Sequence, residues 1–426
     1  MGKHILITSI PSWNQRSGAN TFSTLFEKFD SDDLANLYIR PEIPDSTVCS
    51  RYFNIREWQV VRSVLKRGVV TGSEVERLSI SECDNQGLRK DQSKTEYYSK
   101  NRKRVFLWLR EMAWKLGRWK SKELNEFLDN FRPEVLAFSI EPYPYFNRIN
   151  EYIIKKCNPQ KVIGYLWDDN FTYKQCPNNV FFLIERFFLR KQVRRLVNSC
   201  THVLAINPKM KEECDKEFGV DSIIMTKPLR VRTIPNYQYQ GGVIRLLYTG
   251  SLVIGRDRVL KAIAQAVDKI NVDCVRMKLD IYTNTAINEE YRGKINNYKG
   301  CELHSAIPQS QVFVEQENSD VLIFCESLEK GNNIARLSFS TKITDYLSSG
   351  RCIMAVGPQD NSSIDYFTRE DVALVCTQED EIYDTLKRLV DNDGLLEMYA
   401  EKSCHCGFKN HSAEIMNEKL KQIIYG

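Results

Sequence analysis

Residues 338–356 read SFSTKITDYLSSGRCIMAV, and this stretch decides the fold. The hydroxyl side chains of Ser340 and Thr341 are typical of a helix N-terminus, and Gly350 is typical of the residue that ends a helix. The apolar run Cys352–Val356 that follows predicts a buried strand. A helix that leads directly into a buried strand is the repeating step of a sheet with helices on both faces.

The second half of the chain repeats this step. Near-continuous apolar runs are expected of parallel strands, because helices cover both faces of a parallel sheet. The predicted strands are Ile244–Thr249, Lys278–Tyr282, Glu302–Ala306, Val321–Cys325, Cys352–Val356 and Ala373–Cys376. The predicted helices are Arg258–Ile270, Asn288–Asn297, Ser310–Glu317, Thr341–Ser349 and Glu381–Val390.

The first half alternates in the same way. Its predicted strands are Ile5–Ile10, Leu34–Ile39, Val135–Ile140, Val162–Trp167, His202–Ile206 and Ile223–Thr226. Its predicted helices are Thr21–Phe29, Lys122–Phe131, Phe146–Lys156 and Val180–Asn198. The polar segment 232–242, with its proline and glycines, predicts a linker between the two halves. We therefore expect an α/β protein whose two Rossmann-like domains, 1–235 and 240–410, face each other across a cleft. Whether the C-terminal helix 412–426 completes the first domain is left open.

Composition excludes several classes of protein. With 42% hydrophobic and 27% charged residues, the 426-residue chain is neither disordered nor fibrous. The net charge of +5 does not demand a nucleic-acid partner, and no nucleic-acid recognition motif accompanies it. The N-terminal apolar run is too short for a signal peptide, and no segment reaches the roughly 20 apolar residues of a membrane span.

The thirteen cysteines are an odd number and have no regular spacing. This usage indicates reduced thiols in a cytoplasmic protein. The tightest group, Cys404-His405-Cys406, lacks the paired spacing of a structural zinc site. We expect no bound metal and no resident cofactor.

The loops after strands should carry the function, because ligands bind at the carboxyl ends of such sheets. Gly250 follows a predicted strand, and Arg256 lies just before a helix; this loop either holds an anion or is an exposed charged loop. A cation in the first turn of a helix is unfavourable, so we expect an anionic group near Lys342. Asp345 lies one turn further and can accept hydrogen bonds from ribose hydroxyls. Gly18 marks either a close approach to a ligand or a plain turn.

The segment 338–356 resembles the signature of the group 1 glycosyltransferases of the GT-B fold. In that family a short helix before a Gly-x-x-Ile-x-Ala strand binds the diphosphate and ribose of the donor. Residues 248–258 are similar to the family's glycine loop. Residues 201–210, followed by Phe218-Gly219, resemble the strand and helix that close its N-terminal domain. The resemblance covers both halves, most specifically residues 200 to 360, and makes the first domain acceptor-binding and the second donor-binding.

The resemblance implies roles for individual residues. Those expected to contact the nucleotide-sugar are Gly250, Ser251, Arg256, Tyr282, Ile307, Ser340, Thr341, Lys342 and Asp345. Ile307 belongs to a turn that resembles the segment where the base rests, and Gly18 is placed on the acceptor side. The family has two glutamates separated by seven residues; Leu337 stands at the first position and Asp345 at the second. The family's N-domain histidine has no clear match here.

The resemblance also implies a mechanism. A retaining transferase builds negative charge on the leaving diphosphate, which Arg256, Lys342 and helix N–H groups would stabilise without a metal. Asp168 and Asp169 would orient or deprotonate the acceptor hydroxyl, or else belong to a solvated loop. Glu326, which follows a predicted strand, is a further catalytic candidate near the sugar.

Two segments, 100–120 and 181–195, place aromatic and aliphatic residues at helical spacing among many Lys and Arg residues. Such helices can lie in a membrane interface, where anionic lipids attract the basic side chains. The alternative is that they are ordinary helices whose aromatic residues fill the core.

We therefore expect a hexosyltransferase that moves a sugar from a nucleotide-sugar donor to a glycan or lipid-linked acceptor. Its expected setting is bacterial cell-surface polysaccharide synthesis, in the cytoplasm or peripherally on the inner face of the membrane. The alternatives are a nucleotide-sugar epimerase of the same fold and a non-catalytic partner of a glycosyltransferase.

Overall fold

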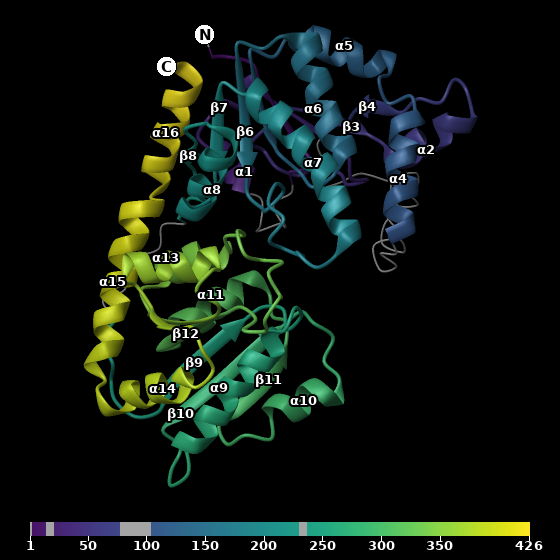
Figure 1. The fold of residues 1–426 in the computed structure, drawn as a ribbon. Coiled ribbons are helices and arrows are strands. Elements are labelled where there is room, and N and C mark those ends of the chain that lie inside the picture. The colour runs from purple at the N-terminus through teal and green to yellow at the C-terminus, as the bar shows by residue number, and fades with distance from the viewer. Residues whose placement is uncertain (1, 14–20, 77–103, 230–236) are drawn as a thin grey trace.

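The computed structural model describes residues 2–13, 21–76, 104–229 and 237–426 (Figure 1). Within these ranges the strands form two sheets. One sheet, in the first half of the chain, has the strand order β4-β3-β2-β1-β5-β6-β7-β8, and the other has the order β11-β10-β9-β12-β13-β14. This is the two-sheet α/β architecture that the alternation predicts.

The first sheet is parallel except for one edge strand. Its strands are β1 (Ile5–Ser9), β2 (Leu34–Tyr38), β3 (Arg51–Ile55), β4 (Gly72–Glu74), β5 (Val135–Ser139), β6 (Lys161–Leu166), β7 (His202–Ala205) and β8 (Ile223–Ile224). Only β4 is antiparallel, pairing Gly72 with Ile55. In β1, every side chain is buried, because β2 and β5 flank it and helices cover both faces.

The helices of the first half connect these strands. They are α1 (Thr21–Phe26), the short 3-10 helix η1 (Ser31–Asp33), α2 (Glu57–Leu65), α4 (Arg104–Leu116), α5 (Lys122–Phe131), α6 (Pro144–Cys157), α7 (Val180–Ser199) and α8 (Pro208–Phe218). Caps define several of their ends. Ser121 accepts from Leu124 N at the start of α5, and Gly219 ends α8 in the left-handed conformation.

The second sheet is wholly parallel. Its strands are β9 (Ile244–Thr249), β10 (Met277–Thr283), β11 (Cys301–Ser305), β12 (Val321–Cys325), β13 (Cys352–Val356) and β14 (Leu374–Cys376). Its helices are α9 (Arg256–Ile270), α10 (Glu289–Ile295), α11 (Gln309–Glu317), α12 (Lys342–Ser349), α13 (Ser362–Glu370), α14 (Glu381–Asp391), α15 (Gly394–His411) and α16 (Ala413–Tyr425). The strand order is that of a doubly wound nucleotide-binding sheet, with the switch point between β9 and β12.

The C-terminal helix α16 packs on the first half of the chain. It contacts α1, and the side-chain amines of Lys3 and Lys161 donate to the carbonyls of Ile424 and Ile423 at 2.9 and 2.8 Å. In Figure 1 the yellow α15 and α16 run along one side of the molecule, from the second sheet to the first. Tertiary packing therefore returns the end of the chain to the domain in which it began.

Candidate active site

The carboxyl ends of the two sheets face each other between the domains (Figure 1). The arrowheads of β6 and β9 point toward the opposite domain in Figure 1, so the carboxyl ends of the two sheets meet there. Hydrogen bonds cross this boundary. Asn207 Nδ2 donates to Leu337 O at 2.9 Å, and Ser338 Oγ donates to Asp168 Oδ1 at 2.7 Å. The segment 337–341 therefore connects the second domain to the first where ligands are expected.

Lys342 lies in the first turn of α12 with its amine against the glycine loop after β9. A Cβ built on Gly250 would lie 1.9 Å from Lys342 Nζ, so a side chain at residue 250 would displace the amine from its place. Nζ also lies 4.7 Å from the centre of the Tyr248 ring. Burial lowers the pKa of Lys342 to about 8, since an ammonium group is poorly solvated there.

Arg256 and Glu326, which follow neighbouring strands, form an ion pair beside Lys342. Arg256 Nη2 lies 2.9 Å from both carboxylate oxygens, and Nε lies 3.1 Å from Oε2. Both residues influence Lys342: the arginine lowers its pKa and the glutamate raises it. Gly255, at φ +78°, turns the chain above Ser327, where a Cβ would lie 2.4 Å from the serine hydroxyl. The sequence predicts both charges at this site but not their pairing.

Three further predicted donor residues, Ser251, Ser340 and Thr341, belong to the segments around this cluster. Ser340 Oγ accepts from Lys342 N at 3.4 Å, so Ser340, rather than the N-cap residue Thr341, supplies the side-chain cap of α12. Ser251 Oγ accepts from Val253 N at 3.3 Å and thereby holds the turn of the glycine loop. These contacts fix the backbone around the lysine amine.

Asp345 faces away from this cluster toward the connection between the domains. Its Oδ1 lies 3.3 Å from the buried amine of Lys227, a residue that follows β8. Asp345, the residue predicted to bind the ribose, is therefore engaged in an ion pair. A ribose would have to share the carboxylate with Lys227.

Tyr282 and Ile307 lie at the far side of the second sheet from β12. Tyr282 is the penultimate residue of β10; its carbonyl accepts from Gly250 N at 2.8 Å and its ring stacks on His304 with the ring centres 4.7 Å apart. Ile307 follows β11 and is half-buried. Tyr282 therefore borders the glycine loop, and Ile307 lies one strand further out.

Asp168 and Asp169 have different environments. Asp169 has no exposed side-chain surface, accepts from Thr172 N at 2.9 Å and lies within 3.8 Å of Arg186 and 3.6 Å of Arg336. Its carboxylate is engaged in holding the loop after β6. Asp168 is half-buried, accepts from Ser338, and has a raised pKa because burial disfavours its charged form. Of the two, Asp168 is the less buried, and Ser338 of the second domain donates to it.

A residue that the sequence analysis missed lies beside Asp168. Glu141 follows β5, next to β1 at the switch point of the first sheet, and is 5% exposed. Its Oε1 accepts from Ser139 Oγ at 2.6 Å and from Trp167 Nε1 at 3.2 Å. Burial raises its pKa to about 7, and the charge of Asp168 adds to the effect. A glutamate directly after a predicted strand was the signal that could have identified it.

The side chains that could bind a metal lie on the second sheet. Within the described ranges, one set of three such side chains has its ligand atoms within 4.8 Å of one another: Asp280, Glu302 and His304. They lie on β10 and β11, and His304 Nε2 is 2.9 Å from Asp280 Oδ1. Cys404 and Cys406 are instead buried on α15 as free thiols. Gly18 lies outside the described residues.

Comparison with known proteins identifies the fold. No protein-family model matches the sequence, and no curated protein matches it. Among solved structures, the α,α-trehalose 6-phosphate synthase of Burkholderia multivorans is similar with a TM-score of 0.60 and 9% identity, covering 100% of this chain and 98% of that one. Anabaena HepE in complex with UDP-glucose has a TM-score of 0.57 and 9% identity, with all of both chains covered. WaaG, a glycosyltransferase involved in lipopolysaccharide biosynthesis, has a TM-score of 0.54 and 10% identity, covering 99% of this chain and all of that one. The chain has the GT-B fold of these glycosyltransferases.

Proposed function

We propose that this protein is a glycosyltransferase of the hexosyltransferase type that uses a nucleotide-sugar donor. The observation that carries the proposal is the buried amine of Lys342, held against Gly250 at the switch point of the second sheet. A buried cation without a full carboxylate partner of its own is costly, and an anionic ligand would stabilise it. The diphosphate of a nucleotide-sugar is such a ligand, and the GT-B fold supports this reading.

The donor is proposed to be a nucleoside diphosphate sugar. HepE is described in complexes with UDP-glucose and with UDP, and its fold covers the whole of this chain. In this chain the glycine loop would contact the diphosphate through Gly250 and Ser251, and Asp345 would approach the ribose. Tyr282 and Ile307 would lie toward the base.

The proposed chemistry is retaining transfer with charge stabilisation by the protein. As the bond to the anomeric carbon breaks, negative charge develops on the diphosphate, and Lys342 in its protonated state would stabilise it. Arg256 would contribute fully to this charge stabilisation only if it exchanged its ion pair with Glu326 for one with the donor diphosphate. The Glu326 carboxylate would then be left beside the sugar. We propose that these groups suffice without a metal ion.

The acceptor would meet the first domain at Glu141 and Asp168. With a pKa of about 7, Glu141 can accept or hold a proton near neutral pH, which suits a group that deprotonates a hydroxyl. Asp168 adjoins it and is joined to the second domain through Ser338. Asp169 would hold the loop after β6 that carries Asp168.

We propose that the acceptor is glycan or lipid-linked and that the enzyme binds the membrane peripherally. Apolar side chains stand exposed on α4 and the start of α7, with Trp108 65% and Phe181 70% exposed. Lys115 and Lys191 lie on the same helices, as expected at an anionic surface. None of the helices in the described ranges is long and apolar enough to cross a bilayer. WaaG's part in lipopolysaccharide biosynthesis supports a role in bacterial cell-surface polysaccharide synthesis on the cytoplasmic face.

The test is release of nucleoside diphosphate from a panel of UDP-, GDP-, dTDP- and CDP-sugars, followed by mass spectrometry with and without EDTA. A transferase releases the nucleoside diphosphate and leaves the sugar on an acceptor or on water. An epimerase would return an isomeric nucleotide-sugar, which has the donor's mass and is recognised by its different chromatographic retention, and a non-catalytic partner would leave every donor unchanged. Lys342→Met should abolish release, whereas Lys122→Met, on exposed α5, should not. Release that EDTA abolishes would contradict only the proposal that no metal ion is needed, and the proposed transferase activity would stand.

A further inference from the structure

A cavity lies in the first domain at the carboxyl end of β3, where β3 pairs with the start of β4. It has a volume of about 400 Å³, within the usual range for small-molecule sites. The residues that line it are Arg56, Gln59, Arg62, Lys66, Gly68, Val69, Val70, Gly72 and Ser73. The sequence analysis did not single out this segment.

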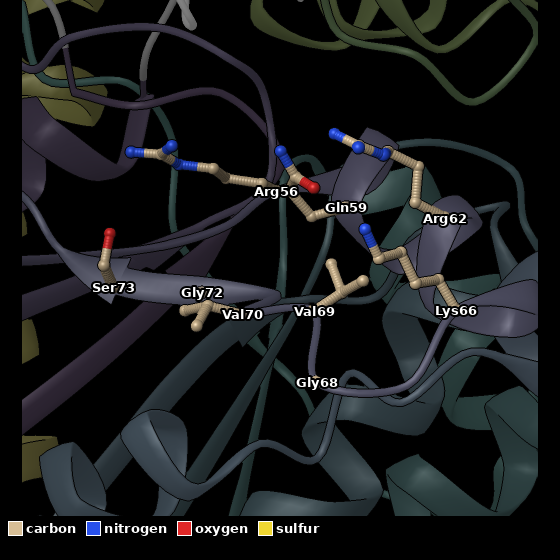
Figure 2. Close-up of a pocket in the computed structure, with 9 residues that line it drawn as sticks. All are labelled: Arg56, Gln59, Arg62, Lys66, Gly68, Val69, Val70, Gly72 and Ser73. Carbon is tan, nitrogen blue, oxygen red and sulfur yellow. The ribbon is translucent and has the colours of Figure 1, made fainter.

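The cavity is built from the β3–α2 and α2–β4 connections. Arg56 follows β3 at the N-cap position of α2, where its side chain makes no capping hydrogen bond. Gln59, Arg62 and Lys66 lie on or just after that helix at spacings of three and four. Residues at these spacings share one helix face. Gly68, at φ +73°, turns the chain back toward β4. Figure 2 shows the side chains of Gln59, Arg62 and Lys66 near one another, whereas that of Arg56 extends away from them, over Ser73.

The cationic side chains that line the cavity are not paired with carboxylates of the described residues. Within the described ranges, none of Arg56, Arg62 and Lys66 forms an ion pair. Arg56 Nε is moreover a buried donor with no hydrogen-bond partner in that part of the chain. A buried donor left unpaired is unfavourable, and it pairs with a ligand only if the Arg56 side chain turns toward the cavity. Guanidinium and ammonium groups both bind the oxygens of a phosphate ester, so a lining with two arginines and a lysine suits such a ligand.

The rim of the cavity is apolar. Leu65 is 94% exposed at the end of α2, and Val70 is 55% exposed within the lining. Helix α2 also packs against α4, and Arg110 of α4 binds Glu57 of α2 with Nη2 2.8 Å from Oε2. The exposed apolar face of α4 therefore lies on the same part of the domain as the basic cavity.

We propose that this cavity binds a phosphate ester on the acceptor, so that the proposed glycosyltransferase acts on a phosphorylated acceptor. The identification of the ligand as the acceptor rests on the proposed function. The affinity of the cavity for a phosphate ester does not depend on it. The ester can belong to a soluble phosphorylated sugar or to a lipid headgroup. Arg56 and Arg62 would bind its oxygens, with Lys66 adding charge and Leu65 and Val70 bordering the rest of the molecule.

The experiment measures binding to the full chain by two routes. Glycerol 3-phosphate is titrated calorimetrically, and sedimentation is measured with phosphatidylcholine vesicles with and without phosphatidic acid. The test variant is Arg56→Gln/Arg62→Gln. The matched control is Lys122→Gln/Lys155→Gln, which removes the same charge from exposed positions on α5 and α6. Circular dichroism and melting temperature establish that both variants fold.

We expect the test variant to bind a phosphate ester about tenfold or more weakly than the wild type, and the control to bind normally. Binding of glycerol 3-phosphate supports the site with a soluble source. Binding only to vesicles that contain phosphatidic acid supports it with a lipid source. Equal binding by the wild type and the folded test variant, or no binding by either route, overturns the proposal.

Nucleotide binding by the same preparations separates this inference from the proposed function. If UDP or another nucleoside diphosphate binds while no phosphate ester binds at the cavity, the acceptor site is wrong and the donor site stands. If the ester binds in an Arg56- and Arg62-dependent manner while no nucleotide binds, the cavity stands and the transferase proposal fails.

Discussion

The amine of Lys342 occupies the space that a side chain at residue 250 would need: a Cβ on Gly250 would lie 1.9 Å from Nζ. Gly250→Ala should therefore displace the amine and weaken binding of the nucleoside diphosphate at least about tenfold, or 1.4 kcal/mol. Isothermal titration measures the change. Gly293→Ala on α10 is the control, because its Cβ would meet Asn297 Nδ2 only at 3.8 Å. Unchanged affinity in Gly250→Ala would separate Lys342 from the donor site.

Donor affinity should depend on pH through Lys342. Its pKa in the free protein is lowered to about 8, so the amine becomes neutral as the pH rises above that value. A bound diphosphate favours the charged form, so binding above pH 8 must take up a proton and affinity should fall. Calorimetry in buffers of different ionisation enthalpy measures this uptake. In Lys342→Arg, whose side chain stays charged, the uptake should vanish; its persistence would assign the proton to another group.

Transfer rate should rise with pH around the pKa of Glu141. Burial raises this pKa to about 7, so the carboxylate needed to accept a proton forms only as the pH passes neutrality. We expect kcat/KM to increase with a midpoint near 7 and Glu141→Gln to remove that rise while lowering the rate about 10²-fold or more. Glu126→Gln, exposed on α5, should leave the profile unchanged. A retained pH profile in Glu141→Gln would exclude this role.

His411 should make stability sensitive to acid. It is buried at the end of α15, with Nδ1 2.7 Å from Thr226 Oγ1 and Nε2 2.7 Å from Tyr366 Oη. Burial lowers its pKa from 6.5 to about 4, so between these values the unfolded chain binds more protons than the folded one. The free energy of unfolding should fall as pH drops from 6.5 to 4, by up to about 3 kcal/mol.

Chemical denaturation at several pH values measures this dependence. His411→Gln should be less stable at neutral pH, because it breaks the contacts with Thr226 and Tyr366, and should lack that part of the slope. His304→Gln, half-exposed on β11, should retain it. An unchanged slope in His411→Gln would assign the acid sensitivity to other groups.

Much of the fold was predictable because parallel strands are nearly continuous apolar runs, as Val321–Cys325 illustrates. Strand β3 was missed, since Arg51 and Asn54 interrupt its pattern. Asn54 is nevertheless buried, because its amide donates to the carbonyls of Tyr38 and Arg40 at 3.2 and 3.0 Å. A tertiary hydrogen bond of this kind cannot be predicted from the local pattern of apolar residues.

The site was predictable only in part for a similar reason. Lys342 could be identified from its place in the first turn of a helix. The pairing of Arg256 with Glu326 joins residues 70 positions apart, so no local pattern contains it. The raised pKa of Glu141 likewise results from burial in the folded domain, and so could not be anticipated from its neighbours in the chain.

The measurement that tests the central claim most directly is a thermal-shift screen of the purified protein against UDP, GDP, dTDP and CDP, with and without EDTA. A ligand at a hundredfold its Kd stabilises the folded state by about 2.7 kcal/mol, which gives a clear rise in Tm. We predict a rise that is selective for one nucleotide, survives EDTA, and disappears in Lys342→Met but not in Lys122→Met. No rise with any nucleotide, or an undiminished rise in Lys342→Met, would contradict a donor site built around Lys342 and Gly250.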